Sequence, residues 1–177
     1  KDFSSGKGGN VVAFLMEHEH FTYPEAIKFL AKKYNIEVDE TETSNEDKEN
    51  RNHIESLYLL NNFAKKFFSK NLWETSEGKA IGLSYLKERG FSEETIRLFG
   101  LGYSFEKQDN LFNTAKKEGY TKQFLEETGL VIFSDSRSLD RFRGRVIFPI
   151  KSMAGRIQGF GGRILSSNPK IAKYLNS

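Results

Sequence analysis

Arginines recur at every second position in the segment 140–150, which reads Asp-Arg-Phe-Arg-Gly-Arg-Val-Ile-Phe-Pro-Ile. If this segment is one extended strand, Arg141, Arg143 and Arg145 share a face and follow each other at about 6.6 Å. That spacing is close to the spacing of phosphates along an extended nucleic-acid strand, and the guanidinium fork suits phosphate. The alternative is a solvent-facing edge strand protected by charge, for which one or two lysines usually suffice. The pattern therefore favours phosphate binding.

A second segment with chemical potential is Gly-Phe-Gly-Gly-Arg at 159–163. Glycine inside a strand marks a place where a ligand or another backbone comes close. The segment does not fit a dinucleotide-binding fingerprint, because the third glycine is misplaced and no helical pattern follows. Arg163 is the better candidate for a phosphate contact, whereas Phe160 is expected in the core. Lys173 and Tyr174 are further candidates, although an ordinary exposed tail has the same composition.

The charge distribution supports a polyanion-binding surface. Residues 137–177 hold nine basic residues and one acid, whereas the other 136 residues hold 18 basic and 23 acidic residues. Six of the nine basic residues are arginine. A basic segment on an acidic body is typical of nucleic-acid-binding proteins, and the simpler alternative is a solvated face.

Several kinds of chemistry are excluded by the composition. The 177 residues include no cysteine, which excludes disulfides, thiolate zinc sites and a catalytic thiol. The His-Glu-His run at 18–20 fits a surface helix end better than a metal site, because the chain has three histidines. The basic segment has no close carboxylates of the kind that hold two Mg²⁺ ions for phosphoryl transfer. The sequence has no run of 18 apolar residues, so it predicts no transmembrane helix.

The elements that must position these residues begin with two short helices. Asn10 is a cap for a helix over 11–17, and Thr22 with Glu25 forms a capping box for a second helix. Residues 39–50 then hold six acids, one Lys and no large apolar side chain. Such a segment cannot bury enough surface to offset its ordering entropy, so we expect a linker and a domain boundary there.

The remainder is predicted to be helical first and extended afterwards. Apolar residues at spacings of three and four predict a long helix over 52–72 and another over 77–88. Gly90 ends that helix, and Ser92 begins the next one. Shorter helices are expected at 109–118 and 121–128, each ended by a glycine. From Leu130 the period changes to two, which predicts strands over 145–150 and 156–164.

The order and spacing of these motifs resemble those of bacterial DnaG-type DNA primases. The resemblance covers essentially the whole chain, including the end of the family's zinc-binding domain. The segments that carry it are 6–15, 23–36, 85–91, 99–103, 140–150, 159–165 and 173–177.

The resemblance implies a fragment with three parts. Residues 1–38 would be the C-terminal part of a zinc-ribbon-like domain, residues 39–50 an acidic linker, and residues 51–177 the N-terminal, basic, template-binding subdomain of the primase core. The TOPRIM subdomain of that core would be absent. The expected fold class is α+β: a small helical remnant of a zinc ribbon, then a helix-rich block packed with an antiparallel β-hairpin or small sheet.

The resemblance also implies a function, because the family synthesises short RNA primers on single-stranded DNA for replication. The parent protein would be a DNA-directed RNA polymerase, a nucleotidyltransferase, with no catalytic residue among these 177. Mg²⁺ or Mn²⁺ would be held in the TOPRIM subdomain. The implied partners are single-stranded DNA template, the RNA primer, NTPs and, through a domain outside this chain, the replicative helicase, with no membrane. The implied location is the bacterial cytoplasm, at the replication fork.

Site residues carry over from the family by their place in the motifs. The nucleic-acid-binding or nucleotide-binding positions would be Arg89, Arg141, Arg143, Arg145, Arg163, Lys173, Tyr174 and Asn176. The family's last two zinc cysteines fall at positions that hold Asp2 and Ser5 here. The thiolates preferred by zinc are gone, so either the ribbon is stabilised without metal or these positions were changed on purpose.

Two other classes of function fit the same residues. One is a non-catalytic module that binds single-stranded nucleic acid. The other is a structural protein whose N-terminal helices dock a partner and whose arginines are ordinary surface. Binding measured at two salt concentrations separates the second from the others, because phosphate contacts weaken steeply with salt.

Overall fold

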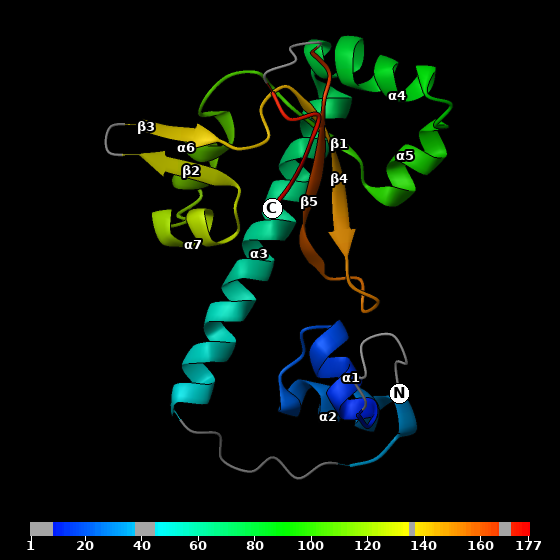
Figure 1. Ribbon diagram of the computed structural model, residues 1–177, viewed down its shortest axis with the longest axis vertical. Coiled ribbons are helices and arrows are strands. Elements are labelled where there is room, and N and C mark those ends of the chain that lie inside the picture. Colours follow the sequence, from blue (N-terminus) through cyan, green and yellow to red (C-terminus); the bar gives the residue numbers. More distant parts are fainter. Residues whose placement is uncertain (1–8, 38–44, 135–136, 167–170) are drawn as a thin grey trace.

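The structure, a computed structural model, describes residues 9–37, 45–134, 137–166 and 171–177 (Figure 1). Asp2, Ser5 and the first half of the expected linker, residues 39–44, lie outside these ranges. No helix within them is long and apolar enough to cross a membrane. In chain order the elements are α1 (Val11–His18), α2 (Tyr23–Tyr34), α3 (Asn45–Glu74), the π-helix η1 (Gly78–Leu83), α4 (Ser84–Glu88), α5 (Glu93–Phe99), β1 (Gly102–Ser104), α6 (Asn110–Lys117), α7 (Lys122–Glu127), β2 (Val131–Ser134), β3 (Arg137–Asp140), β4 (Arg145–Lys151), β5 (Ile157–Ile164) and β6 (Tyr174–Asn176).

The strands form two antiparallel sheets. The larger sheet has the order β1-β4-β5-β6, and β2 with β3 forms a separate two-stranded sheet. Helices surround the larger sheet, with the long α3 running behind it (Figure 1). The α+β class, with a helix-rich block packed against a small antiparallel sheet, is therefore confirmed.

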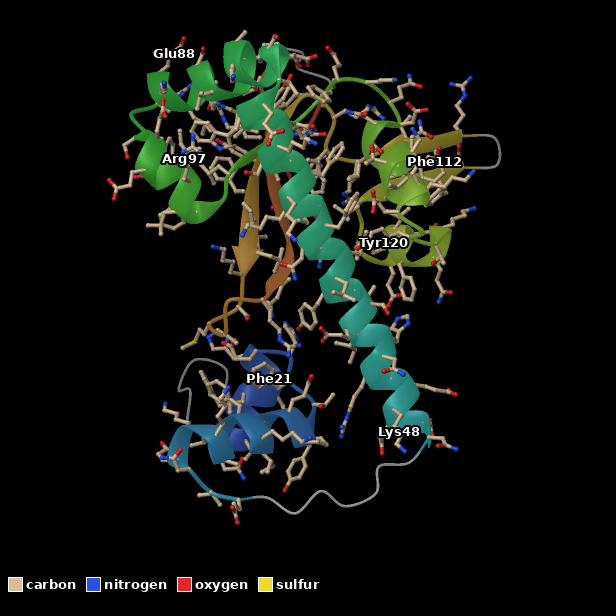
Figure 2. The ribbon with its side chains drawn as sticks, turned by 180° about the vertical axis from the view of Figure 1, so that it is seen from behind. Phe21, Lys48, Glu88, Arg97, Phe112 and Tyr120 are labelled. Atoms are coloured by element: carbon tan, nitrogen blue, oxygen red, sulfur yellow. The ribbon has the colours of Figure 1, made fainter. Side chains whose placement is uncertain are left out.

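One face of the larger sheet packs against α3. Side chains alternate between the two faces of a sheet, and Ile147 of β4 and Phe160 of β5 both point to this face. These two side chains are fully buried and join a cluster with Leu60, Ala64 and Phe68 of α3. The short helices α6 and α7 close the far side of the same cluster. Seen from behind, Tyr120 lies beside α3 (Figure 2), and its ring centroid is 5.0 Å from that of Phe63 on α3.

The other face of the sheet is covered by η1, α4 and α5. Cross-strand partners share a face, and here Tyr103, Val146, Arg163 and Tyr174 form one row across all four strands. Tyr103 and Val146 are buried at one end of this row, in a second cluster with side chains of the covering helices. Tyr174 is 64% exposed at the other end. The row therefore leads from the core to the surface.

The two N-terminal helices have the caps that their sequence predicts. The Asn10 side chain accepts a hydrogen bond from the Ala13 N–H at 2.8 Å, and Thr22 forms the capping box with Glu25. These helices share their own small core, and they contact the β4–β5 hairpin. The buried Glu19 carboxylate accepts a hydrogen bond from the Met153 N–H at 3.0 Å.

Two helices differ from their predicted extents. α3 begins at Asn45 rather than near residue 52, so part of the acidic segment is helical. The helix expected over 77–88 divides into η1 and α4. A Cβ on Gly78 would lie 1.9 Å from the Asn71 carbonyl oxygen, so this turn approaches α3 more closely than a side chain allows. The Thr75 hydroxyl accepts a hydrogen bond from the Gly78 N–H at 2.9 Å and supports the irregular turn.

The predicted helix ends are confirmed. Gly90, Gly119 and Gly129 follow their helices with φ between 64° and 88°, in the left-handed region that favours glycine. Ser92 caps the following helix by accepting a hydrogen bond from the Thr95 N–H at 3.1 Å. These local signals were sufficient because each acts within one turn of the chain.

Candidate nucleic-acid interface

The interpretation of 140–150 as one extended strand is wrong, whereas the strand predicted over 145–150 is present as β4. β3 ends at Asp140 and β4 begins at Arg145, so residues 141–144 form a turn. Gly144 has φ +61°, and its N–H donates to the Phe105 carbonyl at 3.0 Å. The three arginines therefore do not line one face at a regular spacing. The lone glycine within the alternating pattern was the sequence signal for this bend.

Arg145 is also corrected from an exposed residue to a buried one, with a side chain 2% exposed. Its guanidinium group donates to the carbonyl oxygens of Gly162, Lys173 and Ala172 at 3.2, 3.2 and 2.8 Å. Burial lowers the pKa of Arg145, and the neighbouring Arg143 cation lowers it further. Parity explains the burial, because Arg145 points to the same side of β4 as Ile147.

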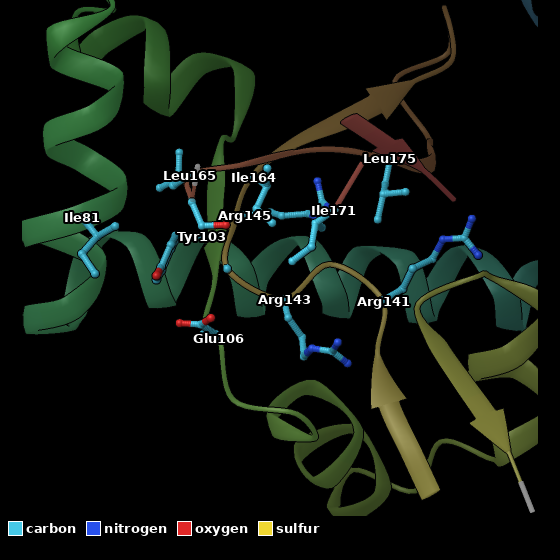
Figure 3. A pocket seen from close by; sticks show the side chains of 12 residues that line it. Ile81, Tyr103, Glu106, Arg141, Arg143, Arg145, Ile164, Leu165, Ile171 and Leu175 are labelled. Atoms are coloured by element: carbon cyan, nitrogen blue, oxygen red, sulfur yellow. The ribbon is translucent and has the colours of Figure 1, made fainter. Parts of the chain in front are cut away.

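Arg141 and Arg143 line a pocket of about 420 Å³ at the end of the sheet (Figure 3). We call it the arginine pocket; its walls also include Tyr103, Glu106 and Leu175. Arg141 donates to the Asn176 carbonyl oxygen at 3.2 Å. Its Nε and the Nη1 of Arg143 are buried without a hydrogen-bond partner, and neither residue forms an ion pair among the described residues. The pocket therefore gathers two guanidinium groups whose charge no acidic side chain of the described residues neutralises, which suits an anion.

A second group joins three of the candidate residues. The Arg163 guanidinium carbon is 4.8 Å from the ring centroid of Tyr85 and 5.9 Å from that of Tyr174, and its Nε donates to the Tyr174 hydroxyl at 3.3 Å. The Arg89 guanidinium carbon is 5.5 Å from the same Tyr85 centroid. We call these four residues the arginine–tyrosine cluster. It alternates cations and aromatic rings, an arrangement that suits phosphates and bases.

Tyr85 was missed as a site residue by sequence reasoning. Its spacing of four from Arg89 on a predicted helix was a usable signal, because side chains at i and i+4 are neighbours. The contact with Arg163 was not predictable in the same way, since it joins α4 to a strand 78 positions later. The segments 85–91 and 159–165 were both recognised as motifs, but nothing in the sequence indicated that they are in contact.

The C-terminal segment brings the remaining candidates to this region. Lys173 and Asn176 are exposed, on either end of β6, which pairs with the glycine-rich β5. A Cβ on Gly159 would lie 2.8 Å from the Ser177 hydroxyl, and one on Gly162 would lie 2.5 Å from the Phe142 ring. The glycines of 159–163 therefore admit neighbouring parts of this chain, and Phe160 is a core residue as expected.

Asp140 is the last residue before the turn at 141–144, and its side chain is buried. Its carboxylate accepts hydrogen bonds from the N–H groups of Leu111 and Phe112 at 2.6 and 3.0 Å, which caps α6. Burial raises the pKa of Asp140 to about 6, although the backbone hydrogen bonds act in the opposite direction. The carboxyl is thus protonated more readily in the folded chain than in the unfolded one.

This shift predicts a pH-dependent contribution to stability. Because the folded-state pKa of Asp140 lies above its ordinary value of 3.8, the stabilisation is greatest below pH 4 and is lost as pH rises to about 6. The free energy of unfolding of wild type, minus that of Asp140→Asn, should fall by about 2–3 kcal/mol over this range. Urea denaturation at pH 4 and 6.5 measures the difference. A difference that grows with pH would mean that the two N–H donors outweigh burial.

The described residues contain no group of three or more His, Asp or Glu side chains that could hold a metal ion. Residues 1–46 match the family described as CHC2 zinc finger. The residues present do not fit a thiolate zinc site, because the sequence has no cysteine and Asp2 and Ser5 offer oxygen donors.

Residues 67–177 match the family described as DNA primase catalytic core, N-terminal domain. The chain is 39% identical over 180 residues to the DNA primase of Clostridium acetobutylicum and 42% identical over 177 residues to that of Halalkalibacterium halodurans. These matches cover 100% and 99% of the chain, but 28% and 29% of the two relatives. The chain thus spans less than a third of the length of the curated relatives that it matches.

Solved structures agree with the sequence matches. A DnaG primase catalytic domain bound to single-stranded DNA superposes with a TM-score of 0.65 and 34% identity, over 72% of this chain and 40% of that one. The Aquifex aeolicus primase, with its zinc-binding and RNA polymerase domains, gives a TM-score of 0.62 and 30% identity over 100% of this chain and 40% of that one. Because the family match covers residues 67–177 and the curated and solved relatives are primases, the chain belongs to the DnaG-type DNA primases.

Proposed function

We propose that these residues supply the template-binding and nucleotide-phosphate-binding wall of a DNA primase. The observation that carries the proposal is the arginine pocket, whose lining includes Arg141 and Arg143, each with a guanidinium nitrogen that has no hydrogen-bond partner. Arg163, Tyr174 and Lys173 extend the basic surface beside it. Guanidinium donors bind phosphate oxygens strongly, and aromatic rings accept stacked bases. Arg145 acts inside this wall as a support, not as a contact.

The related primase domain bound to single-stranded DNA supports a template as the ligand. A second relative, the RNA polymerase domain of Mycobacterium tuberculosis primase DnaG, is described in complex with double-stranded DNA carrying a 6-nucleotide overhang. The charge excess of residues 137–177 is consistent with both. A stand-alone binding module remains the weaker alternative, because the matched relatives are DNA primases.

In this proposal the parent protein is a nucleotidyltransferase that makes RNA primers, and its parts divide the work. Residues 1–38 derive from the zinc-ribbon domain, residues 39–50 join it to the core, and residues 51–177 position template and NTP phosphates. Carboxylates of a TOPRIM subdomain outside these residues would hold Mg²⁺ for phosphoryl transfer. The helicase contact belongs to a further domain, and the enzyme works in the cytoplasm at the replication fork.

We expect the 177-residue chain to bind single-stranded DNA without extending a primer. Its family match covers the N-terminal domain of the catalytic core, and the described residues hold no group of acids that could bind a metal ion. Three or four phosphate contacts should give a slope of log K against log salt of about −2 to −3. Fluorescence anisotropy at several salt concentrations measures the slope, and a primer-synthesis assay with labelled NTPs tests activity. Binding that is insensitive to salt, or primer synthesis by this chain, would contradict the proposal.

A further inference from the structure

We propose that Tyr85 is a positioning residue, which holds the guanidinium groups of Arg89 and Arg163 in place for phosphate binding. This inference rests on the proposed function, and it assigns a role to a residue whose own hydroxyl is not required for it. The ring of Tyr85 is the one element shared by both cations in the arginine–tyrosine cluster. It therefore couples a helix to a strand at the binding surface.

The side chains of Arg89 and Arg163 need a group that restrains them, because they lack carboxylate partners. Among the described residues, neither Arg89 nor Arg163 forms an ion pair with an acid. Long side chains with like charge separate into solvent and retain their rotamer freedom unless something restrains them. The negative face of an aromatic ring within about 6 Å attracts a guanidinium group without neutralising its charge. The restrained cation thus remains available to an anion.

The ring is itself fixed by the core. Tyr85 is half-buried and packs against the cluster that contains Leu86 and Val146. Arg89 follows it by one helical turn, and its N–H donates to the Tyr85 carbonyl at 3.2 Å. Arg163 lies beside Tyr174 through strand pairing. A rigid ring between two adjustable cations reduces the ordering cost of binding, which raises affinity without a new contact.

The test uses the whole chain with labelled single-stranded DNA, measured by anisotropy at two salt concentrations. Tyr85→Met retains much of the core volume but removes the ring, and it should raise Kd by about three- to tenfold and lower the salt slope by about 0.7. Tyr85→Phe should bind like wild type, because the ring is what positions the arginines. Phe148→Met is the matched control, since Phe148 packs against the same cluster with no cation over its ring among the described residues.

A second experiment does not depend on how well the Tyr85→Met variant folds. Phenylalanine analogues with one, two and three ring fluorines at position 85 keep the shape and progressively weaken the attraction for cations. Kd should rise stepwise along this series. If Tyr85→Met and the fluorinated series bind like wild type while Arg163→Ala binds weakly, the positioning role is wrong and the proposed function stands. If Arg163→Ala also binds like wild type, the proposed role of Arg163 fails together with that of Tyr85.

Discussion

Replacing Arg141 and Arg143 together with alanine is expected to raise the Kd for single-stranded DNA on the order of 100-fold at low salt. Both residues line the arginine pocket, and each guanidinium group has one nitrogen that no protein acceptor uses. A hydrogen bond to a charged group contributes about 1.5 kcal/mol at the lower end, and two such losses give about 100-fold. The slope of log K against log salt should become shallower by about 1.4, as expected for two lost phosphate contacts on a single strand.

The matched control is the double change Lys66→Ala and Lys70→Ala. It removes the same net charge from the exposed side of α3, opposite the buried face that carries Phe68. If charge alone drives binding, both double variants lose affinity equally. If the arginine pocket is the template site, the lysine variant keeps an affinity within about threefold of wild type, because distant exposed charges are screened at moderate salt. Equal losses in the two variants would remove the pocket from the proposed function.

Local sequence patterns predicted most of the helices and strands, because the interactions that begin and end these elements act within a few residues. The caps at Asn10 and Ser92 act across three residues, and each has the predicted hydrogen bond. The π-helix η1 was not predictable in this way. It arises where Gly78 approaches the Asn71 carbonyl, and the space between two packed helices is set by the whole core.

The sequence motifs named residues that lie close together in the structure, but the predicted geometry of the three arginines was wrong. The motif residues do gather at one end of the sheet, since Arg141 reaches Asn176 and Arg163 reaches Tyr174. A strict period of two, however, assigned Arg141, Arg143 and Arg145 to one surface. Gly144 breaks that period, and the residue that resumes it, Arg145, points into the core. Arginine is so seldom buried that composition favours the exposed interpretation, and only strand parity reveals the exception.

Arg145→Ala is expected to lower the free energy of unfolding by about 2–4 kcal/mol, because it removes a buried side chain and the three hydrogen bonds that the side chain donates. The three carbonyls lie on β5 and on the segment before β6, so the guanidinium group joins the end of the chain to the sheet. Arg145→Lys should restore little, since an ammonium group lacks the planar fork and burial would favour its neutral form.

The loss of stability caused by replacing Arg145 should be concentrated on β6. Two carbonyls held by Arg145 belong to Ala172 and Lys173, which precede Tyr174, and β6 pairs with β5 over three residues. Hydrogen exchange measures this directly: the β6 amides should lose protection in Arg145→Met, whereas those of the β4–β5 pair should keep it. The DNA affinity should fall as well, because Lys173 and Tyr174 lose their position. Normal β6 protection combined with weakened DNA binding would instead make Arg145 a direct phosphate contact, and the buried fork would then have to reach the template through a rearrangement of the turn at 141–144.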